Sequence, residues 1–154
     1  MFKHPAFGRM SPPEPIYSVY QPIFRLGEGK IMGYEALIRG AGKTKLPEQL
    51  FRAAYEQGYA ILFDLKCLET SFGILPHLEQ GQLLFVNVEP MTLGYAFRER
   101  KEADRLLKKN GSYLERMVFE CAPANGLHAP MVATWDYQGK PCQGGEKGVV
   151  LSPR

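Results

Sequence analysis

The sequence predicts an α/β fold organised around a parallel sheet. Between residues 31 and 120, apolar runs and helical patterns alternate in the order strand, helix pair, strand, helix, strand. Such alternation is typical of parallel strands joined by helices. The run LLFVNV (83–88) is almost continuously apolar before Pro90, as expected of a strand that is covered on both faces.

The predicted domain begins with two strands. IYSVYQPIFRL (16–26) is rich in β-branched and aromatic residues and has a proline interruption at Pro22. The turn GEGK then leads to a second strand, IMGYEALIR (31–39). Strand-forming runs separated by a short glycine-containing turn favour a hairpin.

Two helices are expected next. Pro47 suits the first turn of a helix that runs to about Gln57, where Gly58 can take the left-handed conformation that ends helices. The second helix ends at Pro76, because proline cannot continue a helix. Its apolar face has the spacing i, i+4, i+7 and i+11 and consists of Ile61, Leu65, Leu68 and Phe72.

The remaining sequence divides into a structured and an irregular part. Residues 98–109 predict a charged amphipathic helix ended by NGS, and RMVFE (116–120) predicts a buried strand. Residues 121–154 contain five glycines and four prolines and show no sustained periodicity. We therefore expect an irregular lead-in over 1–16, one domain over 17–120 and an irregular tail over 121–154. The tail is either a long surface loop or a segment other than the one that the preceding strand evolved to be followed by.

Composition excludes several classes of function. The net charge of +3 is too small to indicate nucleic-acid binding. No apolar run reaches the roughly 20 residues of a membrane span, and the N-terminus lacks the apolar region of a signal peptide. Cys67, Cys121 and Cys142 have no C-x-x-C spacing. We expect a cytoplasmic protein that binds neither nucleic acid nor membranes, with Cys67 in the core on a helix.

Each of three predicted strands carries polar side chains in or after an apolar run. Glu35, Leu37 and Arg39 share one face of their strand, Asn87 lies near the end of the next, and Glu120 ends the third. A buried, unpaired carboxylate is costly, whereas oxygen ligands that converge suit a hard divalent cation. The alternative is that these are loop anchors or surface residues.

Four motifs in order carry a family resemblance. YQPIF, GYEALIRG, LLFVNVEPMTL and RMVFE together resemble the EAL domain of bacterial cyclic di-GMP phosphodiesterases, over residues 17–120. The resemblance implies an α/β fold of the partial TIM-type (β/α) barrel kind, roughly its first half, with the site at the C-terminal strand ends. It also implies metal-dependent hydrolysis of a cyclic dinucleotide to its linear form, assisted by paired ions.

The resemblance assigns roles residue by residue. Glu35, Asn87 and Glu120 would bind Mg²⁺ or Mn²⁺. The cyclic di-GMP itself would contact a second set, Gln21, Leu37 and Arg39. Arg39 would reach a phosphate, because a guanidinium binds phosphate oxygens in a bidentate manner.

The sequence departs from the family pattern after Glu120. The family motif E-x-T-E is here ECAP, with Pro123 in place of the second glutamate, and Asp136 in ATWDYQG does not match the family's Asp-Asp-Phe-Gly. We therefore expect a truncated family member without catalytic activity, and we assign no catalytic residue in it. Two alternatives remain: a non-catalytic module that binds cyclic di-GMP or docks a partner, and a non-functional gene remnant that self-associates through an open sheet edge.

Overall fold

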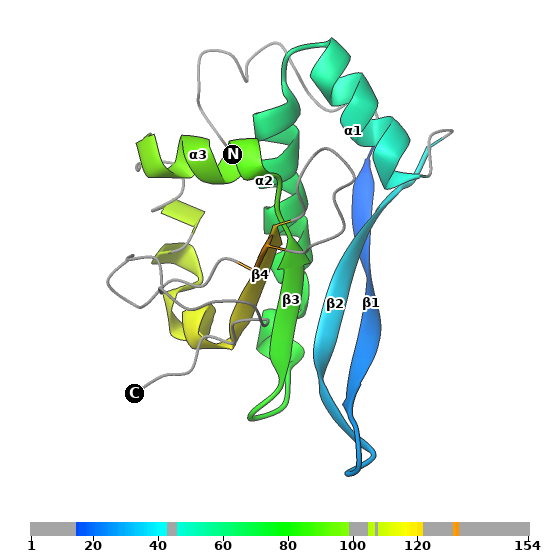
Figure 1. The fold of residues 1–154 in the computed structure, drawn as a ribbon, viewed down its shortest axis with the longest axis vertical. Helices are drawn as coiled ribbons and strands as arrows, with labels where there is room; N and C mark the ends of the chain where they lie inside the picture. Colours follow the sequence, from blue (N-terminus) through cyan, green and yellow to red (C-terminus); the bar gives the residue numbers. More distant parts are fainter. Residues whose placement is uncertain (1–14, 43–45, 99–104, 107, 122–130, 133–154) are drawn as a thin grey trace.

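The computed structural model describes residues 15–42, 46–98, 105–106, 108–121 and 131–132. Its centre is a five-stranded sheet in the order β1-β2-β3-β4-β5, with helices packed against it (Figure 1). The strands are β1 (Ile16–Arg25), β2 (Lys30–Gly40), β3 (Leu83–Asn87), β4 (Met117–Cys121) and β5 (Met131–Val132). The helices are α1 (Pro47–Glu56), α2 (Ala60–Ser71) and α3 (Pro90–Arg98), with 3₁₀ turns η2 (Phe72–His77) and η3 (Gly111–Arg116).

Strands β1 and β2 form the predicted hairpin. They pair antiparallel, and their turn contains Gly27 and Gly29 with φ of +90° and +63°, values that glycine adopts without steric cost. Pro22 does not interrupt β1, contrary to the prediction: the strand continues through it opposite Tyr34. Because β1 is described with a partner on one side only, a missing N–H group is tolerated there. The hairpin forms the long ribbon on the right of Figure 1.

The middle of the sheet is parallel, as the alternating pattern predicts. Strand β2 pairs with β3, and β3 pairs with β4, both in parallel. The two-residue strand β5 pairs antiparallel with the end of β4. It lies within 121–154, where no regular element is expected, so the irregular tail is interrupted at that point. The other residues of 122–154, and residues 1–14 of the lead-in, lie outside the described part of the chain.

The helix predictions are partly confirmed. Helix α1 begins at Pro47, and Gly58 follows it with φ of +75°. The α-helical part of α2 ends at Ser71, earlier than predicted, because the chain tightens into the 3₁₀ turn η2, which contains Pro76. Short 3₁₀ segments of this kind are common at helix ends.

Helix α3 begins earlier than the sequence predicts. It begins at Pro90, well before the predicted start at residue 98. Proline is favoured at the first position of a helix, where no N–H donor is needed. Within the predicted range 98–109, the structure describes residues 98, 105–106 and 108–109 as helical.

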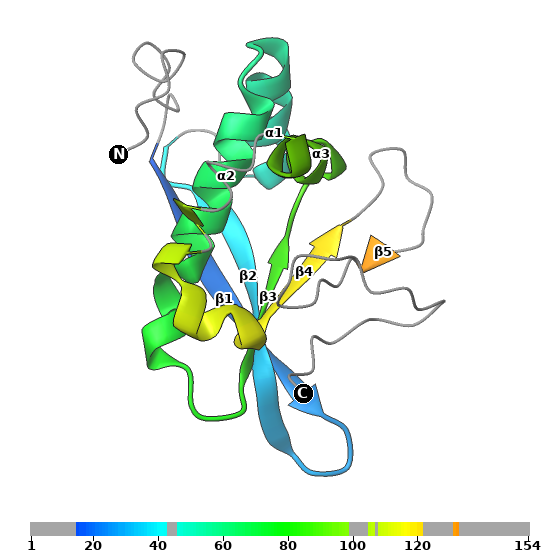
Figure 2. The ribbon, with the colours of Figure 1, turned by 90° about the vertical axis from the view of Figure 1, so that its left-hand side faces the viewer.

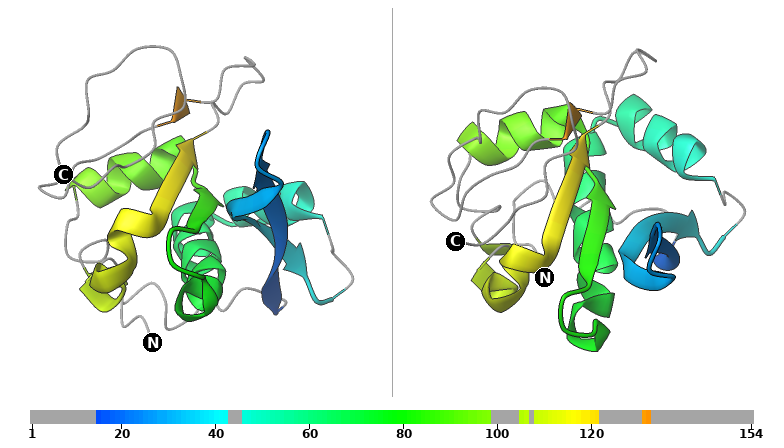
Figure 3. Two further views of the ribbon diagram at one scale, coloured as in Figure 1. Left: turned by 90° about the horizontal axis from the view of Figure 1, so that it is seen from below. Right: turned by 60° about the horizontal axis from the view of Figure 1, so that its bottom comes forward.

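The core lies between α2 and the sheet. Figures 2 and 3 show α2 running along one face of β1, β2 and β3. The predicted apolar face of α2 is confirmed, since Leu65, Leu68 and Phe72 are buried and Ile61 packs against them. The sheet contributes Ala36, Leu84, Val86, Met117 and Cys121 to the same cluster. A second cluster under α1 contains Leu50, Ala54, Tyr59, Ala60, Phe63 and Cys67, so Cys67 is a core residue of a helix as predicted. None of the described helices has the length and apolar character needed to cross a membrane.

Candidate metal and phosphate site

The face of the sheet that points away from α2 carries the polar residues singled out in the sequence. Side chains alternate along β2, so Ala36 and Ile38 pack toward the helices while their neighbours lie on the other face. Glu35, Leu37 and Arg39 are those neighbours, each partly buried. The same-face relationship predicted for these three residues is therefore present.

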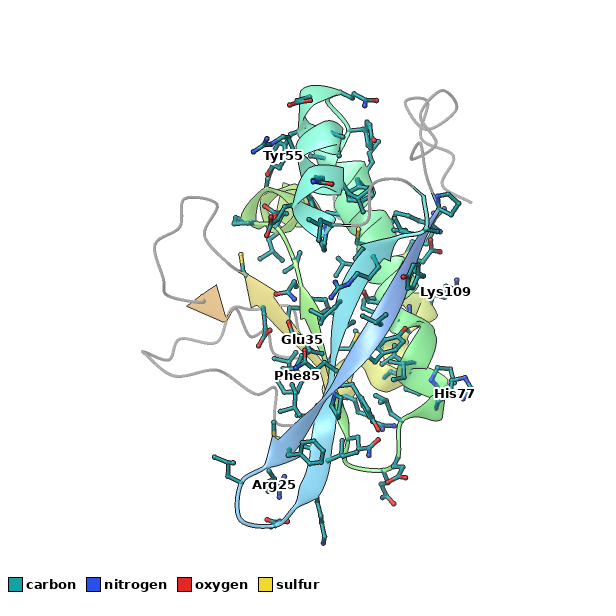
Figure 4. All side chains as sticks on the ribbon, turned by 90° about the vertical axis from the view of Figure 1, so that its right-hand side faces the viewer. Arg25, Glu35, Tyr55, His77, Phe85 and Lys109 are labelled. Carbon is teal, nitrogen blue, oxygen red and sulfur yellow. The ribbon has the colours of Figure 1, made fainter. Side chains whose placement is uncertain are left out.

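The strand register brings polar residues from three further strands to this face. Gln21 of β1 lies opposite Glu35, and Glu35 in turn lies opposite Phe85 of β3. Figure 4 shows Glu35 and Phe85 next to each other in the middle of the sheet. One step toward the C-terminal ends of the strands, Asn87 is paired with Glu120.

Glu35, Asn87 and Glu120 converge, and this cluster is the centre of the candidate site. The side-chain amide Nδ2 of Asn87 donates a hydrogen bond to Oε1 of Glu35 at 3.0 Å. The pKa of Glu120 is raised above its usual value, first because the carboxyl is partly buried and second because the negative charge of Glu35 is near. A cation bound near this amide would reduce the repulsion between the two carboxylates.

These three side chains have the chemistry of ligands for a hard divalent cation, but they are too few to complete its coordination. It supplies two carboxylates and one amide, which are ligands that Mg²⁺ and Mn²⁺ accept. Over the described ranges, no group of three or more histidine, cysteine, aspartate or glutamate side chains forms a metal cluster. The three residues therefore fit part of a coordination sphere, and water or a ligand phosphate would have to supply the rest.

The residues expected to contact a dinucleotide flank this cluster. Arg39 lies opposite Tyr17 near the rim, and its Nη1 donates to the carbonyl oxygen of Ile38 at 2.8 Å. The guanidinium is thus folded back on its own strand. Leu37 lies opposite Val19, and Gln21 is exposed. Tyr17, Val19 and Gln21 are exposed, so the β1 side of this face beside Glu35 is open to solvent.

A buried carboxylate close to this rim was not anticipated from the sequence. Asp64 of α2 is 1% exposed, and its Oδ2 accepts the backbone N–H of Glu89 at 2.9 Å, just after β3. Burial raises the pKa of Asp64 to about 6. Its position in the sequence could have indicated that it is unusual. Asp64 lies three residues after Ile61 and four before Leu68, on the apolar stripe of α2, where a charged side chain is costly.

Comparison with known proteins identifies the family of the chain. The family model for the EAL domain matches residues 14–134. Comparison with curated protein sequences gave no match. The chain belongs to the EAL domain family, the family of the cyclic di-GMP phosphodiesterases.

Solved structures show the same fold over part of their length. A standalone EAL protein from Vibrio cholerae O395 in its c-di-GMP-bound form is 21% identical, with a TM-score of 0.57 over 77% of this chain and 49% of that chain. Bacillus subtilis YkuI, in complex with c-di-GMP and calcium, is 23% identical with a TM-score of 0.58 over 74% and 30%. Klebsiella pneumoniae BlrP1, in a manganese and c-di-GMP complex at pH 6, is 21% identical with a TM-score of 0.56 over 72% and 28%.

These structures support the predicted fold class, a partial TIM-type barrel. The chain spans less than half the length of each of the three proteins. Its sheet is open, with β1 at one side and β5 at the other.

Proposed function

We propose that this chain binds a divalent cation, Mn²⁺ or Mg²⁺, together with a phosphate of cyclic di-GMP, and that it does not hydrolyse the ligand. The observation that carries the proposal is the convergence of Glu35, Asn87 and Glu120 on one face of the sheet, with the Asn87 amide 3.0 Å from Glu35. Family membership and the c-di-GMP-bound relatives name the ligand. The two unpaired, buried thiols of Cys67 and Cys121 suit the reducing cytoplasm as the compartment.

Each residue has a distinct proposed part in binding. Glu35 and Glu120 supply negative charge to the cation. Asn87 would turn its amide group over, so that its oxygen faces the cation in place of the N–H that now points at Glu35. Arg39 would leave the Ile38 carbonyl to take a phosphate oxygen, because a charged acceptor binds a guanidinium more strongly than a neutral carbonyl does.

Hydrolysis of a phosphodiester needs more than this cluster provides. A bound cation there would supply charge neutralisation and polarise a phosphoryl oxygen. An in-line displacement also needs an activated water and stabilisation of the leaving oxygen, which two-metal sites obtain from a second, separately bound ion. The sequence of residues 121–154 has no adjacent aspartates. We therefore propose binding without turnover.

Cation binding is tested first, by titrating Mn²⁺ into the full chain and following water-proton relaxation. We expect saturable binding that Glu35→Gln weakens at least tenfold. Glu28→Gln is the matched control, because Glu28 is an exposed hairpin carboxylate paired with Arg25, away from the cluster. Equal loss in both variants, or no saturable binding by the unmodified protein, would contradict the proposal.

Nucleotide binding and turnover are tested with the same protein. Calorimetry in the presence of Mn²⁺ should show heat from cyclic di-GMP that Arg39→Ala removes, and chromatography should show no linear product after prolonged incubation. Formation of linear product that depends on Glu35 would replace binding with catalysis as the function. Absence of heat at high micromolar ligand would leave only the cation-binding part.

A second candidate is self-association through β1. Residues 16–24 carry no charge, and Tyr17, Val19 and Phe24 of this strand are among the exposed large apolar side chains. Within the described residues, β1 pairs only with β2, and an uncharged edge strand favours pairing with another chain. Light scattering after size-exclusion chromatography should show a dimer that Val19→Lys converts to a monomer. A monomer at all concentrations would reject this candidate.

A further inference from the structure

Asp64 joins two parts of the chain that meet behind the candidate site. Its carboxylate belongs to α2, which covers the sheet, and it accepts the N–H of Glu89, the second residue after the end of β3. The side chain is 1% exposed. A buried carboxylate of this kind costs free energy unless its hydrogen bonds repay the loss of water.

The turn that Asp64 contacts is held from a second side as well. The N–H of Val88 donates to the carbonyl oxygen of Glu120 at 2.8 Å, which continues the β3–β4 pairing one residue past Asn87. The carbonyl of Glu89 then accepts the N–H groups of Thr92 and Leu93, at 3.0 and 3.1 Å, and so begins α3. Residues 88 and 89 are therefore fixed between β4, α2 and the first turn of α3.

Two local contacts offset part of the cost of burying the Asp64 carboxylate. The first turn of a helix carries a partial positive charge, and Asp64 lies at the first turn of α3. The buried Thr92 hydroxyl lies beside the Asp64 carboxyl and lowers its pKa, although it does not reach full hydrogen-bond geometry. Tyr55 donates to Oε2 of Glu89 at 3.3 Å and holds the side chain of the same residue.

We infer that Asp64 is a positioning residue for the candidate site: by fixing the Glu89 N–H it sets the β3–α3 turn, and with it the place of Asn87 beside Glu35. Asn87 is the last residue of β3, with the Glu120 pairing on one side and this turn on the other. Without the acceptor on α2, the turn would lose the contact that ties the Glu89 N–H to the helix layer, and the Asn87 amide would no longer be held against Glu35.

The consequence for ligand binding rests on the proposed function, whereas the consequence for Asn87 does not. In known metal sites, residues that orient the ligands change metal affinity by about 10–100-fold when they are replaced. We expect a loss in that range for Mn²⁺ when the acceptor at position 64 is removed.

The experiment compares three variants of the full chain. Asp64→Ala removes the acceptor, Asp64→Asn keeps an oxygen acceptor in the same place without charge, and Ser71→Ala is the control. Ser71 lies on the same helix, and its hydroxyl donates to the Cys67 carbonyl at 2.9 Å, so the control removes a buried hydrogen bond remote from the turn. The readouts are the side-chain amide resonances of Asn87, which need no metal, and the Mn²⁺ affinity.

We expect Asp64→Ala to shift and broaden the Asn87 resonances and to weaken Mn²⁺ binding about tenfold or more. Asp64→Asn and Ser71→Ala should leave both close to those of the unmodified protein. The inference is overturned if the Asn87 resonances of Asp64→Ala stay in place, if Asp64→Asn is as damaging as Asp64→Ala, or if Ser71→Ala has the same effect.

Two further outcomes are assigned in advance. If Asp64→Ala does not fold, Asp64→Glu replaces it: the longer side chain displaces the acceptor, so unchanged Asn87 resonances would overturn the inference. If the unmodified protein binds no Mn²⁺, the proposed function fails, and the Asn87 resonances alone decide whether Asp64 positions that residue.

Discussion

Replacing Gly33 with alanine should separate β2 from β3 below the candidate site. Gly33 is buried and lies opposite Leu83, where the parallel pairing of the two strands begins. An alanine Cβ would lie 2.9 Å from the carbonyl carbon of Leu83 and 3.0 Å from its nitrogen, and closer still to its carbonyl oxygen. Carbon atoms in ordinary contact are about 3.5–4.0 Å apart. The strands must therefore move apart by at least roughly 0.5–1 Å at this pair.

The expected loss of stability follows from three terms. Overpacking a well-packed site costs about 1–3 kcal/mol, and each backbone hydrogen bond that the separation weakens contributes up to about 1 kcal/mol. Alanine offsets about 0.4–1 kcal/mol of this loss, because it restricts the conformations of the unfolded chain. Gly33→Ala should thus lower the free energy of unfolding by about 2–3 kcal/mol, a large part of the roughly 5–15 kcal/mol typical of a domain.

Urea unfolding monitored by circular dichroism measures this loss, and Gly94→Ala is the matched control. An added Cβ at Gly94, within α3, meets no atom within 4 Å. This second substitution should stabilise the protein by about 0.5–1 kcal/mol, because alanine is the better helix former. The reasoning is refuted if Gly33→Ala unfolds within about 0.5 kcal/mol of the unmodified protein, or if the control is destabilised to the same extent.

Three further predictions concern buried or partly buried groups. The pKa of Asp64 rises from 3.8 to about 6 on folding, so the stability that its proton contributes is complete below about pH 4 and is lost as the pH rises through 6. Across that window, the free energy of unfolding of the unmodified protein should fall by about 3 kcal/mol relative to that of Asp64→Asn. Parallel pH dependences in the two proteins would contradict this prediction. Burial raises the pKa of the Cys67 and Cys121 thiols, so in a variant without the third cysteine Ellman's reagent should react only on unfolding; rapid labelling of the native state would show that these thiols are accessible. Arg116→Ala should cost about 1–2 kcal/mol in thermal unfolding, because the Nε of Arg116 donates to the Gln82 carbonyl at 3.1 Å ahead of β3; Arg116→Lys should restore little, since lysine lacks the guanidinium fork.

The sheet was predictable because its signals are local. The glycine-containing turn predicted the hairpin, and the apolar run at 83–88 predicted a parallel strand covered by helices. The start of α3 is not evident from local sequence, because a proline after an apolar run can follow the end of a strand. Proline is equally suited to the first turn of a helix, and the following residues decide between the two.

The candidate site was predictable in its residues and not in its contacts. Because alternate side chains of a strand lie on the same face, the sequence predicts that Glu35 and Arg39 share one face. The contact between Asn87 and Glu35 depends on the register in which Glu35 faces Phe85, and register between parallel strands is set by the packing of the connecting helices. Asp64 acts across 25 residues of sequence. Its position on an apolar stripe marks it as unusual, but only the fold shows which N–H it binds.

The reversed direction of β1 has a practical consequence for measurement. Because β1 runs against β2, it begins at the end of the sheet where the parallel strands finish, and the carbonyl of Pro15 accepts the N–H of Ala41 at 2.8 Å there. The described chain therefore enters the domain at the end of the sheet that carries Arg39. Because this is also the end of the sheet nearest the candidate site, a polyhistidine tag ahead of the chain would add competing imidazole ligands on that side, so purification for the Mn²⁺ titrations should use a tag that is cleaved or that binds no metal.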